Sequence, residues 1–194
     1  LGPTMPVTTV QLRHNEINFA RISGLAVNKK GHIFVADYVS SKLFRLEQAS
    51  DGLYDLFDVG EQFENPRGLL LDGEENMYVA NTCQIQNLTL TSTGSSSHQL
   101  TLVTRNKNFW PFQIAIDPTT NHVYFTERQK SAFVRKINPN GQIENIGCIP
   151  FVMFFNGFAD GPYDQAIFRM PSGIVINSLG EIFVSDAGNH CIRK

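Results

Sequence analysis

One segment of the chain reads Pro171-Ser-Gly-Ile-Val-Ile-Asn-Ser-Leu-Gly-Glu-Ile-Phe-Val-Ser-Asp186, and three earlier segments repeat its pattern. They begin at Ile22, Pro66 and Pro111, so the starts are 66 − 22 = 44, 111 − 66 = 45 and 171 − 111 = 60 residues apart. A repeat of about 40–50 residues made of short apolar runs and turns is typical of a β-propeller blade. The sequence therefore predicts an all-β protein of radially arranged, four-stranded antiparallel blades.

Each repeat begins with a short run that is almost wholly apolar, followed by a turn and a second apolar run. Such a run suits an inner strand that neighbouring blades cover on both faces. We therefore expect equivalent inner strands at 24–28, 68–72, 114–117 and 173–177. The blades are predicted at 22–65, 66–110, 111–170 and 171–194, the last of them incomplete. The leading segment, 1–21, is predicted to supply an outer strand of a preceding or closing blade.

Composition limits the classes of partner. The chain has 194 residues, 42% of them hydrophobic, and a formal net charge of −2, which argues against a protein devoted to nucleic acid. The charge is uneven: 47–75 holds nine acids and one arginine, whereas 105–136 holds six basic residues and two acids. This pattern indicates either solvated outer strands or a bipolar surface that orients a partner. No run is long and apolar enough to span a bilayer, and nothing in the sequence assigns a compartment.

A polar residue stands at the end of the second predicted strand in every repeat: Asp37, Asn81, Glu127 and Asp186. The residues eight positions later are Arg45, Thr89, Arg135 and Lys194. Because a carboxylate and a cation occur together in three repeats, we expect the carboxylate to accept backbone N–H groups and to pair with that cation. A ring of carboxylates that binds a metal is the alternative interpretation.

The last part of the chain contains Gly157-Phe-Ala-Asp-Gly161, Ala166, Phe168, Pro171-Ser-Gly-Ile174 and Asn189-His-Cys-Ile-Arg-Lys194. In this order the motifs resemble the NHL-repeat family, and the repeats from Ile22, Pro66 and Pro111 resemble it more loosely. The resemblance implies structural repeat positions at Asp160, Gly161, Pro171, Gly173, Asn189, His190 and Arg193. It also implies a propeller that is usually six-bladed, so about four repeats predict a fragment of a longer propeller. Closure as a four-bladed ring is the alternative.

Catalytic motifs are missing from the sequence. It contains no nucleophile elbow, P-loop, HExxH or EF-hand pattern. His32 and His122 precede the second strand in their repeats and are weak candidates for a metal site, because histidine is a common zinc ligand. The resemblance is a second reason to consider them, since an amidating-lyase branch of the propeller superfamily uses a metal and histidines from different blades. We predict no cofactor.

Trp110, Phe112, Arg128 and Lys130 are the residues expected to contact a partner. Tryptophan is a frequent anchor at interfaces, and the two cations belong to the basic segment that would orient a partner. The apolar run 151–155 is a second candidate, and packing between blades is the alternative for both. The predicted function is a non-catalytic scaffold that binds a protein or peptide on a propeller face, with self-association through open blade edges. A metal-dependent enzyme of lactonase or amidating-lyase type and an RNA-binding NHL propeller are the alternatives.

Overall fold

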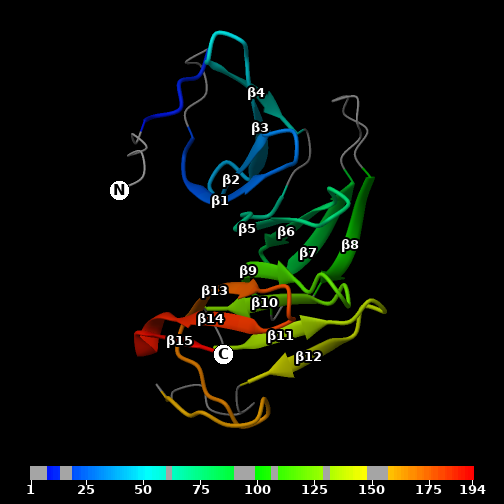
Figure 1. Cartoon of the computed structure of the whole chain (residues 1–194), viewed down its shortest axis with the longest axis vertical. Helices are drawn as coiled ribbons and strands as arrows, with labels where there is room; N and C mark the ends of the chain where they lie inside the picture. The colour runs from blue at the N-terminus through cyan, green and yellow to red at the C-terminus, as the bar shows by residue number, and fades with distance from the viewer. Residues whose placement is uncertain are drawn as a thin grey trace.

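The computed structural model describes residues 8–13, 19–59, 63–89, 99–105, 109–128, 132–147 and 157–194. Within them the chain forms four antiparallel sheets, each built from consecutive strands, and one short 3₁₀ turn. The inner strands of successive sheets contact one another in chain order, so the sheets form an arc of propeller blades (Figure 1). The all-β propeller prediction is confirmed.

The strands of the four blades are as follows. The first blade has β1 (Ile22–Val27), β2 (Ile33–Asp37), β3 (Lys42–Gln48) and β4 (Tyr54–Asp58). The second has β5 (Gly68–Leu71), β6 (Met77–Asn81), β7 (Gln84–Thr89) and β8 (Gln99–Arg105). The third has β9 (Pro111–Ile116), β10 (Val123–Glu127), β11 (Val134–Ile137) and β12 (Ile143–Ile146). The fourth has β13 (Pro171–Ile176), β14 (Ile182–Asp186), η1 (Ala187–Asn189) and β15 (Cys191–Arg193).

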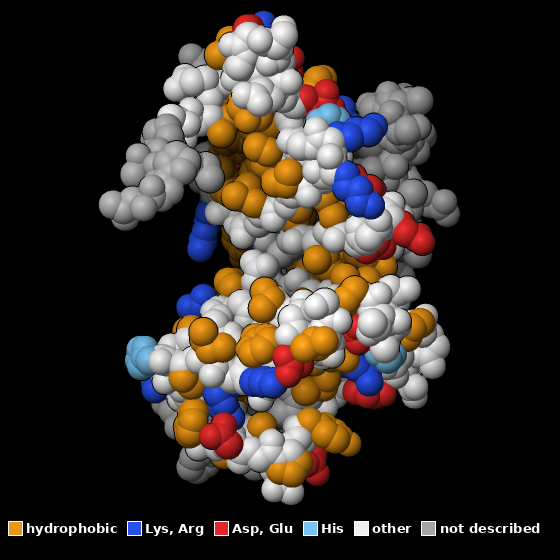
Figure 2. Space-filling model, in the orientation of Figure 1, with side chains coloured by type: hydrophobic (Ala, Val, Ile, Leu, Met, Phe, Trp, Pro, Cys, Tyr) orange, Lys and Arg blue, Asp and Glu red, His pale blue; other side chains and the backbone are white. Residues whose placement is uncertain are grey.

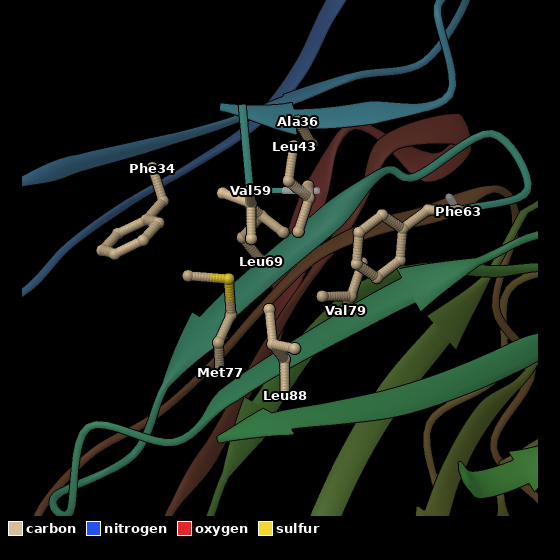
Figure 3. Close-up of a cluster of buried hydrophobic side chains, with 9 residues drawn as sticks. All are labelled: Phe34, Ala36, Leu43, Val59, Phe63, Leu69, Met77, Val79 and Leu88. Carbon is tan, nitrogen blue, oxygen red and sulfur yellow. The ribbon is translucent and has the colours of Figure 1, made fainter. Parts of the chain in front are cut away.

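The core lies between blades. Phe34 and Leu43 of the first blade pack on Met77, Val79 and other apolar residues of the second (Figure 3). Similar clusters join the second blade to the third and the third to the fourth. Alternate residues of each strand therefore face opposite neighbours, which explains why the inner runs are apolar throughout.

Two glycines let the inner strands approach one another. A β-carbon on Gly24 would lie 2.2 Å from the carbonyl oxygen of Arg67, and one on Gly68 would lie 2.9 Å from that of Phe112. Such distances are impossible for a side-chain-bearing residue without a shift of the backbone. Gly24 and Gly68 are thus required where the first blade meets the second and the second meets the third, whereas the third repeat has Gln113 at this position.

The described part of the leading segment packs on the first blade. Leu12 forms a parallel bridge with Tyr54 of β4, and Phe19 contacts Phe44 edge-on with the ring centroids 5.5 Å apart. The role of 1–21 as an outer strand of a preceding or closing blade stays a prediction. The number of blades in the complete propeller also stays a prediction.

The outward faces of the end blades are partly apolar. Leu25 and Val27 of β1 are 62% and 61% exposed, and Val175 and Ile192 of the fourth blade are 62% and 76% exposed. Figure 2 shows hydrophobic side chains gathered on the first blade, at the top of the view. Among the described residues, no helix has the length and hydrophobicity needed to cross a bilayer.

Candidate functional site

The second strands of the four blades end in a polar side chain that is at most 1% exposed. In three blades it is a carboxylate that accepts the backbone N–H of the segment leading into the first strand of the same blade. Asp37 accepts from Ala20 at 2.7 Å, Glu127 from Trp110 at 2.9 Å, and Asp186 from Arg169 at 2.7 Å. We call the edge of the sheets where these side chains lie the carboxylate edge.

Asp37 is held by backbone groups. Besides Ala20, it accepts from the N–H groups of Arg21, Val39 and Ser40 at 3.0–3.3 Å. Burial alone would raise the pKa of this carboxyl, but the four backbone donors outweigh it and lower the pKa below its usual value. The expected pair with Arg45 is wrong, because Arg45 binds Glu47 at 2.8 Å.

The partner of each polar residue is set by strand register. The residue two positions before the polar residue pairs with a residue on the third strand of the same blade. That third-strand residue is Gln86 in the second blade, Arg135 in the third and Arg193 in the fourth. Gln86 accepts from the Asn81 amide at 2.5 Å, Arg135 donates to Glu127 at 2.7 Å, and Arg193 donates to Asp186 at 3.2 Å. The first blade has Phe44 at this register.

A fixed offset of eight residues finds this partner only in the third blade, because the turns differ in length. In the fourth blade it points to Lys194, which instead pairs with Glu181 at 2.5 Å. The predicted Asp186–Lys194 pair is therefore wrong. In the first blade the offset points to Arg45, which lies opposite Phe34 and so on the other face of the sheet from Asp37.

The repeat positions of the fourth blade form one hydrogen-bonded unit. Arg193 reaches the carboxylate of Asp160 at 2.7 Å, and Asn189 donates to Asp186 at 2.8 Å and to the Gly157 carbonyl at 3.1 Å. His190 adopts the left-handed conformation that ends η1. Gly161 has φ +155°, Pro171 begins β13, and the Gly173 N–H donates to Ser185 at 2.7 Å. These contacts join the segment 157–161 to the strands of the fourth blade.

A second group of side chains at the carboxylate edge alternates between arginine and aromatic residues. Its members are Arg21, Tyr38, Arg67, Trp110, Phe112 and Arg128, which we call the arginine–aromatic row. The Arg21 guanidinium lies over the Tyr38 ring at 5.2 Å, and that of Arg67 lies 5.2 Å from Tyr38 and 5.5 Å from Trp110. Arg128 lies 5.3 Å from Phe112. The row crosses three blades.

The row reuses two repeat positions with the residue types exchanged. Tyr38 and Arg128 each follow the buried carboxylate, whereas Arg67 and Phe112 each follow the proline that opens the first strand. In one case the aromatic residue follows the carboxylate, and in the other the arginine does. The two pairs are not equivalent in the fold, because Tyr38 and Arg67 stack between the first and second blades whereas Phe112 and Arg128 stack within the third, but each pair makes a favourable cation–π contact.

Arginines of the row have no carboxylate within 4.0 Å in the described part of the chain. Arg169, exposed at the same edge, donates to the Gly188 carbonyl and likewise has no described carboxylate partner. In contrast, Arg13, Arg45, Arg135 and Arg193 are each paired with an acid. The carboxylates that end the second strands are buried, so the charge that they add to the surface of this edge is small, whereas these arginines have no described acid partner.

The two histidines lie in separate environments. His32 Nδ1 is 3.5 Å from Glu47 of its own blade, and the His122 ring contacts Tyr124 edge-on. In the described residues, no three His, Cys, Asp or Glu side chains gather as a metal site would require. The arrangement offers these histidines no described metal-ligand cluster.

Sequence reasoning found half of the row. Trp110, Phe112 and Arg128 were expected at a partner site, and the structure brings them to one edge; Lys130 and the run 151–155 lie outside the described residues. Arg21, Tyr38 and Arg67 were missed. The signal that could have found Tyr38 and Arg67 is their place in the repeat, after the buried carboxylate and after the proline, where the third repeat has Arg128 and Phe112.

Residues 168–194 match the family model of the NHL repeat. The fourth blade is therefore similar to an NHL repeat. The family resemblance is confirmed in this segment, and the internal unit around Asp186 and Arg193 is the structure of that repeat. No curated protein matched the sequence.

Solved structures with this fold are propellers. Virginiamycin B lyase from Staphylococcus aureus has a TM-score of 0.62 and 16% identity, over 91% of this chain and 53% of that chain. An auxiliary nutrient binding protein from Bacteroides thetaiotaomicron has a TM-score of 0.68 and 16% identity, over 87% of this chain and 46% of that chain. A chain of a nidogen–laminin complex has a TM-score of 0.55 and 16% identity, over 84% of this chain and 60% of that chain. The chain thus spans about half the length of the lyase, and likeness at these identities concerns the fold alone.

Proposed function

We propose that this chain is a non-catalytic interaction module that binds a protein or peptide segment at the carboxylate edge, through the arginine–aromatic row. One observation carries the proposal: three arginines and three aromatic residues gather there, and the described chain supplies no acid to the arginines. Arginine, tyrosine and tryptophan are the residues that most often dominate binding energy at protein interfaces.

The exposure of the row supports this use. Arg21 is exposed, and Tyr38, Trp110, Phe112 and Arg128 are half-buried, so their positions are fixed by packing while part of each side chain still meets solvent. Anchors that are held in place before binding lose less side-chain entropy when a partner arrives. The nidogen–laminin structure shows that a propeller-containing chain takes part in a protein complex, which agrees with the proposal through fold analogy only.

Peptide display on the purified chain is the direct test. We expect selected peptides to lose binding to a Trp110→Ala variant and to keep binding to Phe57→Ala. The control is matched, because each residue has an arginine stacked on its ring, and Phe57 lies on β4, away from the row. Peptides that bind both variants equally would place the binding surface elsewhere.

An enzyme of lactonase or amidating-lyase type is the competing function. The test is a screen of lactones, esters and α-hydroxyglycine substrates with added zinc and calcium. Turnover that disappears on chelation would overturn the non-catalytic proposal.

A further inference from the structure

We infer that the segment bound at the carboxylate edge is acidic, and that Arg67 receives one of its carboxylates between the Tyr38 and Trp110 rings. This inference rests on the proposed function and adds the chemistry of the ligand. Nothing in the fold of a propeller requires it, because Arg67 occupies a position where the other three blades have Ser23, Phe112 and Ser172.

Arg67 is an arginine whose charge is buried without compensation by a described acid. It is 4% exposed, and its guanidinium lies between two rings. Its Nη2 makes a long contact of 3.4 Å to the Tyr38 hydroxyl, and its buried Nη1 has no hydrogen-bond acceptor in the described residues. A buried cation with an unused donor is costly unless an acceptor arrives, and a carboxylate suits a guanidinium both in charge and in geometry.

The other buried arginine differs in this respect. Arg193 is 9% exposed and also lies between two rings, those of Phe158 and Phe168. It donates to Asp186 and Asp160 and to two backbone carbonyls. The chain therefore supplies acids where an arginine serves the fold alone. Arg67 has the same surroundings without the acids, which points to an acid from a partner.

The same row is poorly suited to nucleic acid. Proteins that bind single strands stack bases on open aromatic faces. Here the rings of Tyr38, Trp110 and Phe112 already have guanidinium groups over them. The charge of the arginines in the row has no described counter-ion, and a peptide with carboxylates can pair with it without displacing the arginines from the rings.

The test compares a labelled glutamate-rich peptide with its glutamine counterpart by fluorescence anisotropy. We expect the acidic peptide to bind the 194-residue chain and the glutamine peptide to bind at least about tenfold more weakly. Arg21→Glu and Arg128→Glu should each weaken binding of the acidic peptide by a similar factor. The binding that remains should be less sensitive to salt than binding by the wild type. Lys30→Glu makes the same charge change in the turn between β1 and β2, at the opposite edge, and should leave affinity within about twofold.

Arg67→Met separates a ligand anchor from a merely structural residue. The substitution keeps much of the apolar volume and removes the uncompensated charge, so we expect weaker peptide binding with an unchanged or higher midpoint of thermal unfolding. Equal affinity for both peptides, or acidic-peptide binding that survives Arg21→Glu and Arg67→Met, would overturn the inference. Binding of oligouridylate in preference to the acidic peptide would also overturn it, in favour of nucleic acid.

The two proposals fail separately. If display selects neutral peptides that still depend on Trp110, the interaction module stands and the acidic ligand is wrong. If no selected or acidic peptide depends on Trp110, both are wrong.

Discussion

The first and fourth blades bury an aspartate at the same repeat position and stabilise it differently. Asp37 accepts four backbone N–H groups and pairs with no cation among the described residues, whereas Asp186 accepts one N–H from Arg169 and also binds Asn189 and Arg193. What the two have in common is the bond to the segment that leads into the first strand. The difference teaches that the three blades with a carboxylate share this bond, that the second blade with Asn81 lacks it, and that the cation is an addition.

The largest effect should come from removing the shared aspartate where a buried cation depends on it. We expect Asp186→Ala to lower the free energy of unfolding by about 3–5 kcal/mol, because it leaves Arg193 buried with the exposed Asp160 as its remaining acid. Asp37→Ala should cost about 1–3 kcal/mol, since it leaves only backbone donors unsatisfied. Urea unfolding checks both, and a larger loss for Asp37→Ala would contradict the comparison. Peptide binding at the row should change little in either variant.

Building the fourth blade's pair into the second blade would sharpen the comparison. Asn81→Asp alone should destabilise, because the new carboxylate is buried next to the neutral Gln86. Adding Gln86→Arg should recover about 1–3 kcal/mol, measured as the coupling energy of a double-mutant cycle. A coupling energy near zero would show that register alone does not make the pair.

Acid should reveal a smaller contribution at the opposite edge. The hydroxyls of Thr119 and Thr120 lower the pKa of Asp117 from its ordinary 3.8 to about 2. Because the folded value lies below the unfolded one, this carboxylate stabilises the protein at neutral pH, and its contribution is lost as pH falls from about 4 towards 2. Asp117→Asn should therefore be less stable at neutral pH and show a shallower loss of stability across that window. Equal slopes for both proteins would contradict this assignment.

The outward faces of the end blades should produce the weakest effect, a concentration-dependent self-association of the chain. Leu25 and Val175 occupy positions that are partly or fully buried where one blade meets another inside the arc. Val175→Asp should reduce the association seen by sedimentation velocity, with the exposed turn variant Leu179→Asp as control. A monomer at every concentration would contradict the prediction.

The fold could be read from the sequence because it depends on spacing and on apolar periodicity, which act locally. The inner strands at 24–28 and 173–177 were found for this reason. The partners of Asp37 and Asp186 were not, because pairing across strands depends on turn length, and one residue changes which face a side chain occupies. The role of Arg67 was not predicted, because its two ring partners come from the neighbouring blades. One of them, Tyr38, is 29 residues before it in the sequence.

Gly24 and Gly68 have a consequence for the shape of the whole array. Neighbouring inner strands touch there with no room for a β-carbon, near the centre around which the blades turn. A methyl group at either position would push the narrow ends of the blades apart and reduce the angle between them. Curvature, and with it the number of blades that would complete a circle, is therefore set partly by the absence of a single carbon atom.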